Sequence, residues 1–144
     1  MSAFNFNLEK VLNVRNIQED IAQNNYMKAK KKKEEIKDEL DKLNETKNET
    51  FNFLRNKANS SVEMTLQARR FLQLHKKKID NQKSVLEKQK HVLQKKQREM
   101  IEKQKKRKVL DKLREKEYYS FYKEQMKAEQ KELDEIAQRN NEVK

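Results

Sequence analysis

The chain contains no glycine, proline, cysteine or tryptophan among its 144 residues. Without glycine and proline it lacks the residues that tight turns favour, which argues against a meandering sheet. Without cysteine it forms neither disulfides nor thiolate metal sites. No apolar run approaches the roughly 20 residues that span a bilayer. The first residues, 1–12, have neither the basic start nor the apolar core of a signal peptide, so a cytosolic location is expected.

Charge and helical periodicity are what the sequence has in abundance. Charged residues make up 42% of the chain and hydrophobic residues 33%, a composition typical of coiled coils and long helices. Full disorder is the alternative for such a chain. Sustained seven-residue repeats argue against disorder, because a strict repeat keeps one stripe of a helix facing a partner helix. The apolar members of this repeat are Leu72, Ile79, Leu86, Leu93 and Met100.

The second contact position of each of these heptads is polar. It is occupied by His75, Gln82, Gln89 and Lys96. Strong zippers place apolar residues at both positions. The sequence therefore predicts a long helix that has a partner and is not very stable alone.

An earlier segment repeats apolar residues at alternating spacings of three and four, which predicts a first helix of about 50 residues. Nine of the 14 positions on this stripe are apolar. The stripe consists of Leu8, Leu12, Arg15, Glu19, Ala22, Tyr26, Ala29, Lys33, Ile36, Leu40, Leu43, Lys47, Thr50 and Leu54. A second apolar stripe runs beside its start, so this end offers more apolar surface than a hairpin would bury. The second stripe consists of Val11, Val14, Ile17 and Ile21.

The periodicity lapses between Arg55 and Ser61, where asparagine and serine gather. Ser60 and Glu63 have the spacing of a capping box, which predicts the start of a second helix. A short connection makes the flanking helices antiparallel neighbours. One unbroken helix that dimerises with another copy is the alternative. If the chain does fold back, Leu8 lies opposite the region of Leu110, and everything later in the second helix overhangs.

The predicted fold is therefore all-α: an antiparallel two-helix coiled-coil hairpin with a longer C-terminal helix. We interpret residues 1–144 as a single coiled-coil domain. Its predicted parts are helix 1 at about 7–55, a turn at about 56–61 and helix 2 at about 62–140.

Signatures of an enzyme are missing. The two histidines, His75 and His91, are 16 residues apart, and no cysteine accompanies either of them. A glycine-rich phosphate loop is excluded because there is no glycine. We therefore expect no catalytic residues, no metal and no cofactor.

Positive charge is concentrated in one half of the chain. The segment Leu66–Lys116 has 19 basic and 6 acidic residues, whereas the rest has 17 basic and 18 acidic residues. This excess favours acidic partners. A basic coiled-coil nucleic-acid-binding protein is an alternative, but aromatic residues are not interleaved with the lysines for base stacking. Nucleic acid is therefore not an expected partner. A homodimeric structural rod is a further alternative.

Aromatic residues cluster late in the second helix, in the predicted overhang. The cluster consists of Tyr118, Tyr119, Phe121 and Tyr122. Two readings stay open: these rings anchor a partner protein, or they pack against Phe4 and Phe6 of the folded-back N-terminal segment. Either reading brings the two chain ends together.

Three segments of the chain resemble the flagellar type III export protein family FliJ. They are Phe4–Arg15 (FNFNLEKVLNVR), Leu110–Lys116 (LDKLREK) and Glu129–Ala137 (EQKELDEIA), of which the last is the most specific. The resemblance covers essentially the full length, with a matching total size.

The resemblance implies a non-enzymatic coiled coil similar to the central stalk of rotary ATPases. It implies three partners: the hexameric FliI-like export ATPase, the FlhA-like export gate in the membrane, and export chaperones. It also implies a cytoplasmic location at the inner face of the membrane. The positions matching the family's gate contact are Phe71, His75, Lys78 and Gln82; here a histidine replaces an aliphatic residue and Lys78 a small one. The residues expected at the ATPase end are Val11, Val14, Ile17, Ile21, Tyr118, Tyr119, Phe121, Tyr122, Leu133 and Ile136.

Overall fold

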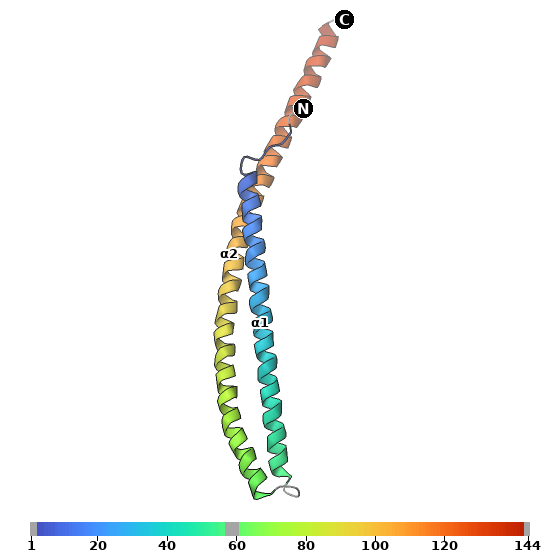
Figure 1. Cartoon of the computed structure of the whole chain (residues 1–144). Helices are drawn as coiled ribbons and strands as arrows, with labels where there is room; N and C mark the ends of the chain where they lie inside the picture. Colours follow the sequence, from blue (N-terminus) through green and yellow to red (C-terminus); the bar gives the residue numbers. More distant parts are fainter. Residues whose placement is uncertain (1–2, 57–60, 143–144) are drawn as a thin grey trace. The chain divides into compact units, whose positions relative to one another are not determined.

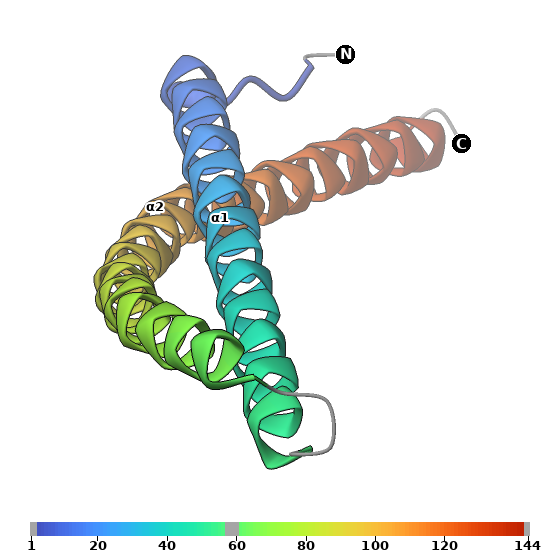
Figure 2. The same cartoon turned by 60° about the horizontal axis from the view of Figure 1, so that its bottom comes forward.

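The computed structural model describes residues 3–56 and 61–142. These residues form two α-helices, α1 (Glu9–Arg55) and α2 (Val62–Glu142), and no strand occurs among them. In both views the end of α1 and the beginning of α2 lie beside each other (Figures 1 and 2). The predicted fold class, an antiparallel two-helix hairpin whose C-terminal helix is the longer, is confirmed.

The chain divides into two compact units, and both helices run through both of them. One unit comprises residues 22–100, and we call it the hairpin unit. The other comprises residues 1–21 and 101–144, and we call it the end unit. The interpretation of the chain as a single domain stays a prediction.

The core of the hairpin unit lies along the predicted stripes. From α1 it buries Ala22, Ala29, Ile36 and Leu40, and from α2 it buries Ala68 and Ile79. Over the whole predicted α1 stripe, only Leu8 and Lys47 are exposed. The heptad leucines of α2 are half-buried. The seam, as we call this line of contact between the two helices, is therefore narrow, as the sequence predicts.

The polar seam residues of α2 form hydrogen bonds with the backbone of α1. His75 Nε2 donates to the carbonyl oxygen of Leu43 (2.7 Å); because a carbonyl oxygen only accepts, Nε2 carries the hydrogen. Gln82 Nε2 donates to the carbonyl oxygen of Ile36 (3.1 Å) and also to Glu39 Oε2 (3.1 Å). These two residues belong to one repeating arrangement that continues along the seam.

The third member of this arrangement is Gln89, whose Nε2 donates to the carbonyl oxygen of Ala29 (3.0 Å). The three donors follow one another at intervals of seven residues along α2, and their three acceptors lie at the same interval in the opposite direction along α1. We call His75, Gln82 and Gln89 with their carbonyl acceptors the polar ladder. The ladder gives these buried and half-buried polar groups partners, which removes the cost of burying them unpaired.

The start of α2 is capped by Ser61. Ser61 Oγ accepts a hydrogen bond from the backbone N–H of Met64 (3.2 Å), and its carbonyl oxygen accepts one from the N–H of Thr65 (3.1 Å). A helix that begins at Val62 has its N-cap at position 61, one residue after the Ser60 of the predicted capping box. Ser60 and most of the predicted turn lie outside the described residues.

Contacts in the end unit lie between about one and three turns further along α2 than the extrapolated pairing predicts. Arg114 Nε donates to Glu9 Oε2 (3.1 Å), whereas the prediction set Leu8 opposite the region of Leu110. Long helical side chains lean toward the N-terminus of their own helix. In an antiparallel pair two such side chains lean toward each other, so residues further along both chains meet.

The polar ladder predicts a difference between two substitutions of Gln89. We expect Gln89→Leu to raise the free energy of unfolding by about 1 kcal/mol, because leucine buries apolar surface in the seam. We expect Gln89→Ala to lower it by about 1–2 kcal/mol, through the lost hydrogen bond and the space left behind. Urea unfolding followed by circular dichroism measures both. A leucine variant less stable than the unmodified chain would contradict this balance.

Candidate functional site

The end unit brings the first residues of the chain onto the aromatic cluster of α2. The ring of Phe4 meets the ring of Tyr118 edge-on, with centroids 5.2 Å apart, and lies tilted against Phe121 at 5.6 Å. The Arg114 guanidinium lies 6.0 Å from the centroid of the Phe4 ring. Phe6 is buried. Of the two readings left open by the sequence, packing on the N-terminal segment therefore applies to Tyr118 and Phe121.

The remaining predicted residues of α2 at this end are exposed. Tyr119 and Tyr122 are both more than half exposed, and Lys123 Nζ lies 4.7 Å from the centroid of the Tyr119 ring. Leu133 and Ile136 lie in Met126–Glu142, where every residue is exposed. This stretch is the red end of α2 in Figure 1. These side chains are therefore accessible to a partner.

The second apolar stripe of α1 is uncovered in the end unit. Ile17 is 58% exposed and Ile21 is 55% exposed. Val11 and Val14 are exposed as well. Four aliphatic side chains on one face of a highly charged helix form an apolar surface of the kind that marks an interaction site.

A buried ion pair connects the two segments of the end unit. Arg107 forms hydrogen bonds with both carboxylate oxygens of Glu19, and its Nη1 donates to Asp111 Oδ2 at 2.5 Å. These bonds, first that with Glu19 and then that with Asp111, raise the pKa of the Arg107 guanidinium above its ordinary value. The arginine is therefore charged at neutral pH, and it compensates the Glu19 carboxylate, which is 6% exposed.

The four positions predicted to contact the export gate separate into two groups. His75 and Gln82 belong to the polar ladder, and His75 is only 5% exposed. Phe71 and Lys78 are exposed. Phe71 stacks on the His75 ring, with centroids 5.0 Å apart, so the buried histidine supports the exposed phenylalanine. The gate contact itself stays a prediction.

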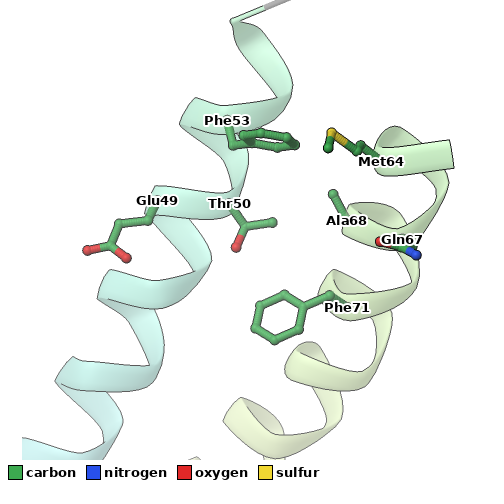
Figure 3. A pocket seen from close by; sticks show the side chains of 7 residues that line it. All are labelled: Glu49, Thr50, Phe53, Met64, Gln67, Ala68 and Phe71. Atoms are coloured by element: carbon green, nitrogen blue, oxygen red, sulfur yellow. The ribbon is translucent and has the colours of Figure 1, made fainter. Parts of the chain in front are cut away.

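An apolar groove near the start of α2, which we call the tip groove, lies beside Phe71. Phe53 of α1 and Met64 of α2 point toward each other across it, and Phe71 points from α2 toward α1 (Figure 3). Its volume is about 470 Å³. Its other lining residues are Glu49, Thr50, Gln67 and Ala68. The groove was not predicted from the sequence. The one sequence feature that indicates it is Phe53, an apolar residue that lies outside the predicted α1 stripe.

A second groove in the hairpin unit has an apolar floor and lysines around it. We call it the lysine groove; its volume is about 400 Å³. It is lined chiefly by Lys47, Phe51, Leu72, Lys76, Ile79 and Lys83. Its only signal in the sequence is weak: Phe51 lies off the predicted α1 stripe, and Lys47 lies on it.

Neither a metal cluster nor a membrane-spanning helix is found in the described part of the chain. Within residues 3–56 and 61–142, no group of three or more histidines and carboxylates is placed to hold a metal ion. Within the same residues, no helix combines the length and apolarity needed to cross a bilayer. The fold and its surfaces define a class of protein: a coiled-coil hairpin whose exposed apolar residues lie off the seam.

Comparison with known families identifies the chain within this class. The sequence matches the family described as flagellar FliJ protein over residues 4–142. The chain belongs to the FliJ family and is a component of flagellar type III protein export. The predicted family resemblance is thus confirmed.

Comparisons with individual proteins add one solved structure. It is described as that of a YscO homolog, CT670, from Chlamydia trachomatis. Its sequence is 18% identical, the alignment covers 98% of this chain and 97% of that chain, and the TM-score is 0.49. The comparison with curated proteins finds no match.

The two ion pairs of the end unit predict contrasting effects on stability. We expect Arg107→Ala to lower the free energy of unfolding by about 2 kcal/mol, because it leaves the buried Glu19 carboxylate unpaired. The pair of Arg114 with Glu9 is about half exposed on both sides. Arg114→Ala should therefore cost less than about 1 kcal/mol. Chemical unfolding of both variants measures the difference. Equal decreases in the free energy of unfolding would show that the burial of Glu19 does not determine the effect of Arg107→Ala.

Proposed function

We propose that this protein is a non-enzymatic stalk and adaptor of flagellar export. It inserts its end unit into the ring of a FliI-like export ATPase and stimulates that ATPase. It also contacts the FlhA-like export gate and escorts export chaperones. The observation that supports this proposal is the exposed apolar surface of the end unit, contributed by both chain ends.

The end unit suits insertion into a ring because its own packing leaves apolar side chains free. The N-terminal segment covers part of the aromatic cluster through Phe4, whereas Tyr119 and Tyr122 remain exposed. On α1 the exposed stripe includes Ile17 and Ile21. Aromatic and aliphatic side chains that lose contact with water carry much of the binding energy at protein interfaces. Such binding favours the assembled ring over its separate subunits by mass action.

The gate contact is proposed for Phe71 and Lys78 in the hairpin unit. These two side chains are accessible, whereas the polar atoms of His75 and Gln82 are bonded to α1. We assign His75 a supporting role beneath the Phe71 ring. Because the gate is a membrane protein, this contact places the chain at the inner face of the membrane at the flagellar base, while it remains cytoplasmic.

Stimulation of a FliI-like ATPase tests the proposal. We expect the purified chain, at micromolar concentration, to raise ATP turnover. Ile17→Asp combined with Ile21→Asp should lower the apparent affinity for the ATPase about tenfold or more, because a charge enters a desolvated apolar contact. Deletion of residues 118–144 should abolish stimulation.

Met27→Asp is the matched control for this experiment. Met27 is 58% exposed, as Ile17 is, and it lies on the same helix but in the hairpin unit. This variant should stimulate the ATPase normally. Absence of stimulation by the unmodified chain, or equal stimulation by the Ile17/Ile21 and Met27 variants, would overturn the stalk proposal.

The gate contact makes a separate prediction. We expect Phe71→Ala and Lys78→Glu each to weaken binding to the cytosolic part of an FlhA-like gate protein by about tenfold, as loss of an aromatic anchor or reversal of a charge does. Isothermal titration calorimetry measures the change. Phe51→Ala, at an equally exposed phenylalanine in the lysine groove, should bind normally. Unchanged binding by both gate variants would remove the gate contact from this face.

A further inference from the structure

The lysine groove is a binding site built by both helices of the hairpin unit. Phe51 comes from α1, and Leu72 and Ile79 come from α2. Ile79 is buried and Leu72 half-buried, so they form the apolar floor, while Phe51 is 40% exposed beside them. A space of about 400 Å³ is large enough for one large apolar side chain. The groove is independent of the surfaces that carry the proposed function.

Three lysines surround this apolar floor. Lys47, Lys76 and Lys83 line the groove, and Asp80 is its one acidic lining residue. Within the described part of the chain, none of the three lysines forms an ion pair. Lys47 Nζ lies 6.0 Å from the centroid of the Phe51 ring. The groove thus combines an apolar floor with a net positive charge, three lysines against one aspartate.

The same combination continues around α2, on the side turned away from Leu72 and Ile79. An adjoining hollow of about 470 Å³ shares Lys76 and Asp80 with the lysine groove and adds Lys77 and Leu74. Leu74 is 63% exposed, so it is a second apolar contact point beyond the first.

We propose that the lysine groove binds an acidic amphipathic helix of a partner protein. One apolar side chain of that helix fills the space against Phe51 and Leu72. Its glutamates or aspartates face Lys47, Lys76 and Lys83. An amphipathic helix supplies both features, because its apolar residues recur at i, i+3, i+4 and i+7.

The groove chemistry favours a protein over a nucleic acid. A phosphate backbone supplies the negative charge, but it has no apolar group to fill the floor. The stacking of a base requires a free aromatic face, and Lys47 lies over the ring of Phe51. Membrane binding requires a broad apolar face opposite the lysines, whereas this floor is a narrow groove between two helices.

The tip groove provides an internal comparison. It is also apolar, and its phenylalanine, Phe53, is 42% exposed, close to the value for Phe51. Among its described lining residues, Glu49 is the one charged residue and none is a lysine. An acidic helix should therefore distinguish the two grooves by charge.

A peptide titration of the full chain tests the proposal. The probe is a fluorescently labelled helical peptide with leucines at i, i+3, i+4 and i+7 and glutamates at the other positions. We expect saturable binding by fluorescence anisotropy that weakens as salt is added. Lys76→Glu and Phe51→Ala should each weaken it by about tenfold or more. The same peptide with lysines in place of the glutamates should not bind.

Two matched variants complete the experiment. Phe53→Ala removes an equally exposed ring from the tip groove, and Lys31→Glu makes the same charge change on an exposed part of α1 outside both grooves. Both should bind the acidic peptide normally, and circular dichroism checks that every variant is folded. Absence of saturable binding, or equal losses for Lys31→Glu and Lys76→Glu, would overturn the proposal. Loss of duplex DNA binding but not of peptide binding in Lys76→Glu would also overturn it, in favour of nucleic acid.

Discussion

Hydrogen bonds from His75, Gln82 and Gln89 to backbone carbonyls of α1 fix how the two helices of the hairpin unit face each other. The seam is too thin in apolar residues to do this by leucine packing alone. A buried or half-buried amide needs a partner, so a small rotation or slip of either helix would leave these groups unsatisfied. Polar seam residues lower the stability of a coiled coil and reduce the number of alignments that it can adopt.

The polar ladder cannot by itself exclude a slip of a whole heptad. Its acceptors are spaced by one heptad, so such a slip would return Gln82 and Gln89 to similar carbonyls. The ion pair between Glu19 and Arg107 has no such repeat, because Glu19 is the one acidic residue on the α1 stripe. A shift of the seam would leave this buried carboxylate without its arginine, at the same cost of about 2 kcal/mol that is expected for Arg107→Ala. The polar ladder therefore disfavours small slips of the helices, and the ion pair between Glu19 and Arg107 disfavours a slip of a whole heptad.

A narrow seam also explains why so much apolar surface remains available to partners. Two packed helices bury one stripe each, and apolar residues on any other stripe stay exposed. Ile17 and Ile21 lie on such a stripe in the end unit, and Phe51 and Phe53 flank the seam in the hairpin unit. In a larger globular protein further helices would cover these residues. Here they stay exposed, which is what the proposed adaptor role in export requires.

The helices and the seam follow from the sequence alone, because helical periodicity is a local property that no distant residue has to supply. The spacing of Leu40 and Ile79 with their neighbours identified residues that the structure buries. It also marked Gln89 as a seam residue, but not as a donor to a carbonyl. Only the tertiary structure decided that bond, the packing of Phe4 on Tyr118 and the two grooves. Each depends on how segments far apart in the chain are aligned, and side-chain lean and the folding back of the chain set that alignment.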